Sequence, residues 1–303
     1  MKKRSALAII CAALGNIIWG FSFLFTTVGL NTTAPDILLA HRFVISTLLM
    51  LVPVFMGKIK ISFKGKHLGP VALLLLFQLS YYWMESYAVL HTNSTISGLV
   101  LAVVPVVTIG TGIVFLKEYP TKRQAFFCLM PVTGIILMTI SGKELGVITP
   151  IGVLFLLLTL LSSAFYKTVN RKVSEEFSPY ERTFMVLAIS AIVFTITGLR
   201  SAGWDVGAFV APLAKPKYLG SVLCLSVLCS IAANLLVNYA VSHMSVFKVS
   251  SFGALSTLCT MVAGIVFLKE PVSWELLLGA ALILVGIRQI TKPVPQKEEK
   301  VSK

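Results

Sequence analysis

Charged residues are scarce in this sequence: Asp, Glu, Lys and Arg make up 13% of its 303 residues, whereas 56% are apolar. Soluble domains carry about 25% charged residues, so the composition excludes an ordinary soluble domain. A transmembrane helix needs roughly 20 apolar residues, and ten such helices would leave only short loops and two tails. The chain therefore has no room for a large soluble domain.

Acidic residues are scarcer than basic ones, with 12 Asp and Glu against 26 Lys and Arg, and the net charge is +14. The basic residues form no patch with interleaved aromatic residues, which argues against a nucleic-acid partner. They are scattered over the short segments between apolar runs, as the positive-inside rule describes for membrane proteins.

Motifs that carry chemistry are also missing. The sequence has no H-E-x-x-H, no G-x-S-x-G, no P-loop and no pair of intramembrane aspartates, which argues against a membrane enzyme. Its five cysteines lie in apolar runs without C-x-x-C spacing, so we interpret them as packed thiols rather than disulfides or metal ligands. We expect no cofactor and no metal.

Long apolar runs broken by Pro, Gly and charge are the main feature that is present. The first run follows Met-Lys-Lys-Arg but has no small-x-small cleavage site, so we expect a retained helix rather than a signal peptide. The longest loop is expected at 199–217, with a surface-lying turn near 204–209. The ten predicted spans are 6–30, 36–56, 68–90, 94–116, 123–141, 151–169, 180–198, 218–241, 246–268 and 274–291.

The distribution of Lys and Arg predicts the orientation of these spans. With the amino terminus inside, 17 basic residues fall on the inner side, five fall in the outer loops, and four lie within or at the ends of spans. This asymmetry predicts that both termini are cytoplasmic. A compact chain with short tails also suits the inner membrane of a bacterium.

The chain contains an internal repeat. Residues 87–118 match residues 239–270 at a constant offset of 152, with 13 of 32 positions identical. A weaker similarity, at an offset of 144, relates the starts of the two halves. We therefore divide the chain into two repeats of five helices, residues 1–146 and residues 147–303.

Five is an odd number, so the two repeats must cross the membrane in opposite orientations, related by a pseudo-twofold axis in the membrane plane. Such inverted repeats are typical of secondary transporters, which bind substrate near the midplane and alternate access to it. The predicted fold is an all-α membrane protein with ten transmembrane helices in two inverted five-helix repeats around a central cavity. The alternative is an old duplication kept only for stability.

Short motifs are ordered along the chain and partly duplicated between its halves. They are Trp19-Gly20, Pro35, Arg42-Phe43, Pro105, Phe115 to Glu118, Ser178-Pro179, Tyr239-Ala240 and Gly264 to Glu270. Together they resemble the EamA-type branch of the drug/metabolite transporter superfamily, over nearly the whole chain. The resemblance implies ten helices, eight of them around a central cavity, and export of small metabolites such as amino acids without ATP. The sequence departs from a symmetric proline hinge, because Thr257 takes the place of Pro105 in the second repeat.

Charges inside a bilayer are costly, so they are the best functional candidates. Glu85 lies about five residues from the outer end of its predicted helix, roughly 7 Å deep, and Arg42 lies at a similar depth. They could pair as a static ion pair, or Arg42 could bind a substrate carboxylate while Glu85 binds an amine or a proton. His41 could relay a proton, although we favour an interhelix hydrogen bond.

Two predicted helices carry polar stripes that would suit opposite walls of one aqueous cavity. The alternative is that these side chains only hold helices together through hydrogen bonds. The stripe on the third span consists of Gln78, Tyr82, Glu85 and Ser86. The stripe on the eighth span consists of Ser226, Ser230, Asn234 and Asn238.

Further candidates lie in three other spans. Asn16, Trp19 and Phe23 share a face of the first span, where Trp19 could stack on a substrate or simply pack. Tyr166 in the sixth span is another candidate for substrate contact. Pro105 removes a backbone hydrogen bond from the fourth span and could act as a hinge.

From these features we expect a secondary active transporter that exports small amphipathic metabolites, amino acids first among them, by alternating access. Protons are the candidate coupling ion, and the expected partners are a small-molecule substrate and the lipid bilayer. A selective channel or a lipid scramblase would use the same cavity and is the main alternative. Counterflow separates the two, because only a carrier shows exchange that substrate on the far side accelerates.

Overall fold

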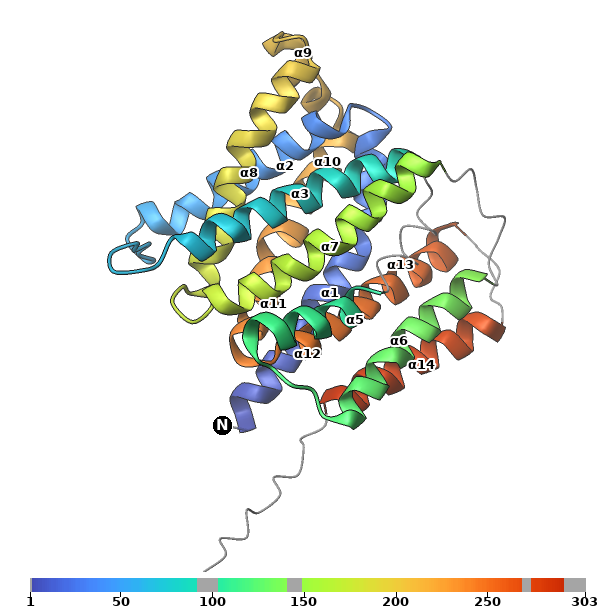
Figure 1. The fold of residues 1–303 in the computed structure, drawn as a ribbon. Helices are drawn as coiled ribbons and strands as arrows, with labels where there is room; N and C mark the ends of the chain where they lie inside the picture. Colours follow the sequence, from blue (N-terminus) through green and yellow to red (C-terminus); the bar gives the residue numbers. More distant parts are fainter. Residues whose placement is uncertain (1, 92–102, 141–148, 269–273, 292–303) are drawn as a thin grey trace, which may run out of the picture.

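The computed structural model describes residues 2–91, 103–140, 149–268 and 274–291, and the regular elements of these residues are all helices. Figure 1 shows their arrangement as a bundle. Up to residue 140 the helices are α1 (Lys2–Leu30), α2 (Pro35–Phe55), α3 (Gly69–His91), α5 (Val104–Thr111), η1 (Gly112–Leu116) and α6 (Lys122–Ile140). From residue 150 they are α7 (Pro150–Val173), α8 (Pro179–Ser201), α9 (Val206–Val210), η2 (Ala211–Ala214), α10 (Pro216–Cys224), η3 (Leu225–Ala232), α11 (Ala233–His243), α12 (Val246–Ser251), α13 (Gly253–Leu268) and α14 (Trp274–Thr291).

Each predicted span coincides in whole or in part with helix. The main differences from the prediction lie within the spans rather than at their ends. The span predicted at 218–241 is one continuous run from α10 to α11 that adopts π-helical geometry over η3. The π-helical η1 ends the span predicted at 94–116, whose first residues lie outside the described chain. The turn expected within 199–217 is present as α9 and η2.

Five of the described helical runs are long and apolar enough to cross a membrane: Ala6–Leu30, Pro35–Phe55, Pro150–Val173, Pro179–Ser201 and Pro216–His243. Shorter apolar helices are Val104–Leu116, Val246–Cys259 and Leu277–Ile290.

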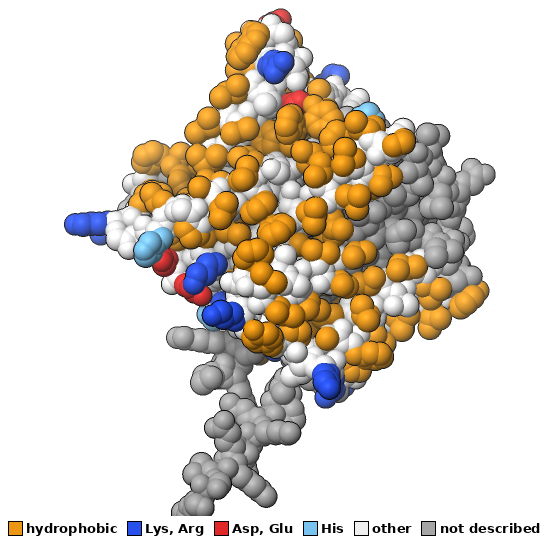
Figure 2. Space-filling model, in the orientation of Figure 1, with side chains coloured by type: hydrophobic (Ala, Val, Ile, Leu, Met, Phe, Trp, Pro, Cys, Tyr) orange, Lys and Arg blue, Asp and Glu red, His pale blue; other side chains and the backbone are white. Residues whose placement is uncertain are grey.

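Many polar residues are buried and many large apolar residues are exposed along these helices. On α2, Asp36, His41 and Ser46 are buried, whereas Val52 is 50% exposed and Phe55 is 83% exposed. Figure 2 shows that apolar side chains cover the middle of the visible face and that Lys and Arg lie mainly near its margins. A lipid environment favours this distribution, because hydrocarbon solvates apolar side chains and leaves polar groups to pair inside the protein.

The helices pack mainly in pairs. The pairs are α2 with α8, α3 with α7, and α6 with α14, and α1 packs against both α11 and α13. The α6–α14 pair lies at one edge of the bundle in Figure 1 and comes together through glycines. A Cβ atom on Gly134 would lie 2.6 Å from the Gly279 carbonyl oxygen, so only glycine permits this backbone approach.

The α2–α8 pair is antiparallel. Ser201 near the end of α8 donates to the Asp36 carboxylate at the start of α2, and Tyr180 at the start of α8 donates to the Met50 carbonyl near the end of α2. In Figure 1 the N-terminus lies at the end of the bundle that also holds the α2–α3 and α7–α8 connections. We call this the N-terminal end, and α9 lies at the opposite end.

Candidate functional site

The polar stripe predicted on the eighth span lies inside the bundle. Ser226 and Ser230 are fully buried, and Asn234 and Asn238 are 5% and 2% exposed. The first two residues of this stripe, Ser226 and Ser230, lie on η3. Short π-helical segments of this kind are frequent at functional sites. The Cys229 carbonyl in η3 accepts hydrogen bonds from the Trp19 Nε1 at 3.0 Å and the Asn234 Nδ2 at 3.2 Å.

Arg42 reaches this stripe from α2. Its Nε donates to the Ser230 Oγ at 2.6 Å, and the Ser226 Oγ donates to the Arg42 carbonyl at 2.9 Å. The guanidinium carbon lies 5.2 Å from the centre of the Phe43 ring and 5.7 Å from that of Tyr82, which is within the range of cation–π attraction. Arg42 is thus a cation held by neutral groups.

The α3 stripe faces the stripe on η3 and α11. Tyr82 is buried, and its hydroxyl lies within hydrogen-bonding reach of the Gln78 and Asn234 side chains. The Glu85 Oε1 accepts from the Tyr81 hydroxyl at 2.7 Å, and the Ser86 Oγ donates to the Tyr82 carbonyl at 2.8 Å. The two predicted stripes therefore meet at Tyr82, whereas Ser86 bonds within its own helix.

Arg42 and Glu85 lie within electrostatic reach of each other but do not form an ion pair. Among the described side chains, Arg42 is bound by Ser230 and Glu85 by Tyr81. Glu85 is only partly buried, so it is accessible as well as deep in the bundle. The charges are placed so that each could meet a different group of one ligand.

The α1 candidates make contacts of different kinds. Asn16 is buried and its Nδ2 donates to the Ala12 carbonyl at 2.7 Å, within its own helix. Trp19 instead joins α1 to η3 through the Cys229 carbonyl. The side chain of Phe23 lies outside the described part of the chain.

His41 makes the interhelix hydrogen bond that the sequence favoured. Its Nδ1 lies 2.8 Å from the Tyr218 hydroxyl, and its ring centre is 4.8 Å from that of Phe209. These partners belong to α10 and α9, near the end of the bundle opposite the N-terminus. His41 is therefore directed away from the contacts that Arg42 makes with Ser230.

Pro105 is buried in the first turn of α5. Proline is well tolerated there, because the first turn of a helix has no intrahelical acceptor for its N–H groups. The residues that precede it, 92–102, lie outside the described chain, so the hinge remains a prediction.

A second cluster, around Arg182 in α8, was missed in the sequence. Arg182 is 0% exposed, and its Nη1 donates to the Asn170 Oδ1 at 2.6 Å. Its Nη2 donates to the Asn238 carbonyl at 2.7 Å and to the Ser242 Oγ at 2.6 Å. The Asn238 side chain accepts from the Asn170 Nδ2 at 2.7 Å, so α7, α8 and α11 meet in one polar cluster. The available signal was the continuation of the eighth-span stripe toward Ser242, four residues after Asn238.

Tyr166 in α7 links the two clusters. Its hydroxyl lies within electrostatic reach of both Tyr82 and Arg182. Lys167, the next residue, lies deep among the helices yet keeps part of its surface exposed, and no described side chain pairs with it.

Ion pairs join the connections at the N-terminal end. The Glu118 Oε1 accepts from the Arg171 Nε at 2.8 Å, and its Oε2 accepts from the Val246 backbone N–H at 2.8 Å. Lys66 pairs with Glu181 at 2.7 Å. Of the two Lys-Glu pairs that end the duplicated motif, at 117–118 and 269–270, the structure describes the first, and its Glu118 ties α7 to the start of α12.

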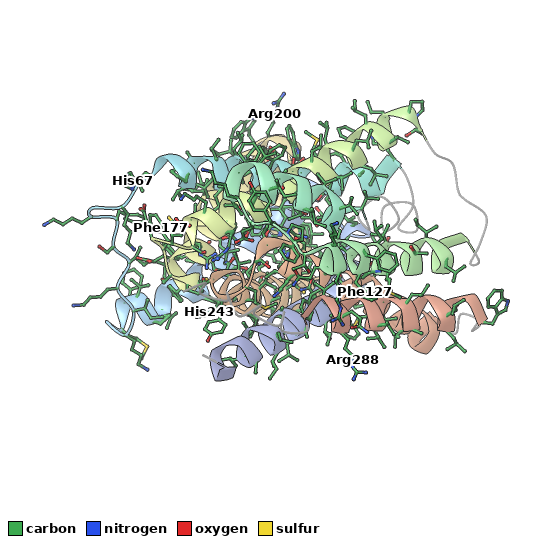
Figure 3. All side chains as sticks on the ribbon, turned by 60° about the horizontal axis from the view of Figure 1, so that its bottom comes forward. His67, Phe127, Phe177, Arg200, His243 and Arg288 are labelled. Atoms are coloured by element: carbon green, nitrogen blue, oxygen red, sulfur yellow. The ribbon has the colours of Figure 1, made fainter. Side chains whose placement is uncertain are left out.

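The α2–α3 and α7–α8 connections also meet at this end. The His67 backbone N–H and the His67 Nδ1 both lie 2.7 Å from the Glu176 carboxylate. These two hydrogen bonds hold the pKa of the Glu176 carboxyl below its ordinary value. Figure 3 shows His67 and Phe177 close together on this side of the bundle, far from Arg200.

Comparison with known proteins gives the same family for both halves of the chain. The model of the EamA-like transporter family matches residues 6–140 and again residues 150–291. The uncharacterized transporter YcxC of Bacillus subtilis is 33% identical over 291 residues, which cover 95% of this chain and 93% of the relative. An uncharacterized transporter of Archaeoglobus fulgidus is 21% identical over 291 residues, covering 95% and 98%.

A solved crystal structure shares the fold, with a TM-score of 0.76 over 94% of this chain and 98% of that one, at 15% sequence identity. Buried polar clusters inside an apolar-surfaced helical bundle fit a multi-pass membrane transporter, and the sequence relatives agree. The matches cover almost the whole length, and the chain belongs to the EamA-like transporter family, within the drug/metabolite transporter superfamily.

Proposed function

We propose that this transporter is a secondary active exporter of small metabolites, amino acids first among them, that works by alternating access in the cell inner membrane. Ten transmembrane helices form two inverted five-helix repeats, residues 1–146 and 147–303, with both termini cytoplasmic. The observation that carries the proposal is the polar interior formed by Arg42, Tyr82 and Glu85 against the buried stripe on η3 and α11.

The packing pattern supports the inverted repeats. The first helix of one half, α1, packs against the run from α10 to α11, and the first helix of the other half, α7, packs against α3. A twofold exchange of the halves maps one pair onto the other. The same exchange maps α2–α8 and α6–α14 each onto itself, as expected for pairs that lie on the symmetry axis.

The N-terminal end supports an outward-open or occluded state. The contacts of Glu118 with Arg171 and Val246 join the fourth, sixth and ninth spans there. The Lys66–Glu181 ion pair joins the α2–α3 connection to α8. In alternating access these contacts form and break as the cavity opens to one side and then the other. In this proposal these contacts close the cytoplasmic side, to which the positive-inside rule assigns this end.

Efflux from proteoliposomes loaded with a mixture of amino acids and related amines, read by mass spectrometry with and without an inward proton gradient, tests the function. We expect selective loss of a few solutes, faster with the gradient. We expect Glu85→Gln to export them more slowly and to lose the pH dependence, because the amide carries no titratable proton. Wild-type rate and pH dependence in this variant would remove Glu85 from coupling.

The matched control is Tyr81→Phe, which removes the hydroxyl that Glu85 accepts from but leaves the carboxylate. It should keep the pH dependence. A channel or scramblase would move solutes without saturation and without acceleration by substrate on the far side, so counterflow separates these alternatives from a carrier. Absence of counterflow with measurable solute movement would replace the carrier with a channel.

A further inference from the structure

The part of the interior around the polar stripe on η3 and α11 carries more positive than negative charge. Three cations, Arg42, Lys167 and Arg182, lie there with one carboxylate, Glu85. The buried carboxylates of Asp36 and Glu181 lie near the two ends of α8, where Tyr87 and Ser201 donate to Asp36 and Lys66 pairs with Glu181. A cation transferred from water into a protein interior needs a counter-charge, because the neighbouring dipoles replace only part of its hydration. The imbalance therefore points to an anion that the protein itself does not supply.

Arg182 shows the imbalance most clearly. It is 0% exposed, and four of its N–H groups donate to neutral acceptors on Asn170, Asn238 and Ser242. Its Nε is buried and has no hydrogen-bond partner. The Arg171 guanidinium lies within electrostatic reach and adds to the positive potential. Arg182 thus has one free donor and an uncompensated charge.

The carboxylates of Glu181 and Glu118, on the same side of the bundle, are engaged elsewhere. Glu181, which precedes Arg182, accepts from Lys66 and from the Ser62 and Ser178 backbone N–H groups. Glu118 accepts from Arg171. Within the described chain, neither is directed at the Arg182 guanidinium.

Arg42 and Arg182 lie at two depths along the same polar stripe. Their partners Ser230 and Asn238 are eight residues apart, about 12 Å of rise along a helix. Tyr166 lies within electrostatic reach of Arg182 and of Tyr82, and Tyr82 lies under the Arg42 guanidinium. Hydroxyl and amide groups therefore lie along the stripe between the two arginines.

Resting on the proposed transport function, we infer that the cargo is a small carboxylate with net negative charge and that Arg182 is a binding residue for its carboxylate. Arg42 is the second binding residue for the anion, at the other of the two depths along the stripe. The free Arg182 Nε donates to the carboxylate, and the bound anion neutralises the buried cation. A zwitterion neutralises the interior less, and an organic cation is repelled by it.

Four solutes of similar size but different charge test this inference on the wild-type chain: L-glutamate, L-glutamine, L-lysine and succinate. They are loaded into proteoliposomes, and efflux of each is measured alone and in competition. We expect glutamate and succinate to leave at least about tenfold faster than glutamine and lysine, as one charge-assisted hydrogen bond allows. Faster efflux of glutamine or lysine overturns the inference while leaving the transporter intact.

Movement of none of the four also overturns the inference. The efflux of the broader mixture then decides whether the transport proposal falls with it, so the two failures are distinguishable. Preference for glutamate over succinate, or the reverse, supports the inference equally, because both are anions at neutral pH; succinate lacks the ammonium group and is one carbon shorter.

Variants of Arg182 test its role directly. Arg182→Gln should weaken the ability of glutamate to compete for efflux about tenfold to a hundredfold, and it should change glutamine efflux by less than about threefold. Arg182→Lys keeps the charge and should keep the preference for anions. Arg200→Gln is the matched control, because Arg200 lies exposed at the other end of the same helix. Equal losses for all four solutes in both Arg182 variants would assign Arg182 a structural role and overturn the inference.

Discussion

At the scale of single residues, the eighth-span stripe is buried and the third-span stripe is buried at Gln78 and Tyr82, but the sequence did not point to Arg182. It is the fourth residue of α8, and basic residues near helix ends ordinarily extend to lipid headgroups. Its burial depends on Asn170 and Asn238, which come from α7 and α11. Contacts between three helices far apart in the chain leave no periodic signal in the sequence, whereas a stripe on one helix does.

Arg42→Lys should weaken substrate binding about tenfold while leaving the fold intact, because lysine keeps the charge but loses the planar fork and its Nε donor. Two quantities are measured: the substrate concentration that half-saturates counterflow, and the melting temperature in detergent. Ser230→Ala is the companion variant, since it removes the acceptor of Arg42 and leaves the guanidinium. If both variants lowered melting temperature and affinity in parallel, Arg42 would be a structural residue.

At the scale of elements, helix positions follow from apolar run length and breakers, and most ends agree within a few residues. The capping box of α8 is a local signal of this kind, since Ser178 and Glu181 exchange hydrogen bonds. The π-helical turns of η1 and η3 were not predicted. A short π-helical turn barely changes the spacing of apolar residues, so the sequence does not reveal it. It depends instead on the hydrogen-bond partners of groups such as the Cys229 carbonyl.

Gly134→Ala should destabilise the protein without changing its substrate preference, because the new methyl group meets the Gly279 carbonyl oxygen in the α6–α14 pair. We expect a lower melting temperature and unchanged half-saturation in counterflow. Gly220→Ala is the control, since a Cβ there meets nothing within 4 Å and alanine favours a helix by about 1 kcal/mol. A changed substrate preference in Gly134→Ala would place α6 at the substrate path.

At the scale of the whole molecule, the halves resemble each other in sequence, and the pairing of their helices agrees with the proposed twofold relation. The repeat at 87–118 and 239–270 predicted this relation, but it could not show which contacts close one end. Those contacts depend on single side chains and their partners in other helices. Glu118 pairs with Arg171 and caps α12, whereas its counterpart Glu270 lies outside the described chain.

The Glu118–Arg171 pair should therefore control opening at the N-terminal end. Glu118→Gln replaces a carboxylate that accepts from both Arg171 and the Val246 N–H with a neutral amide, and charge-assisted hydrogen bonds are about twice as strong as neutral ones. We expect amide exchange around the α11–α12 connection to rise at least about tenfold in lipid nanodiscs, measured by hydrogen–deuterium exchange. Substrate on that side should bind more readily.

A suitable control is present at the same end. Glu175 pairs with Lys172 on the surface, where both side chains are more than half exposed, and such pairs contribute little. Glu175→Gln should leave amide exchange unchanged. Equal exchange in the two variants would mean that the closure depends on apolar packing rather than on Glu118. A rise confined to Glu118→Gln, with faster counterflow, would show that one ion pair sets the balance between the two access states, because it joins spans that must separate when this end opens.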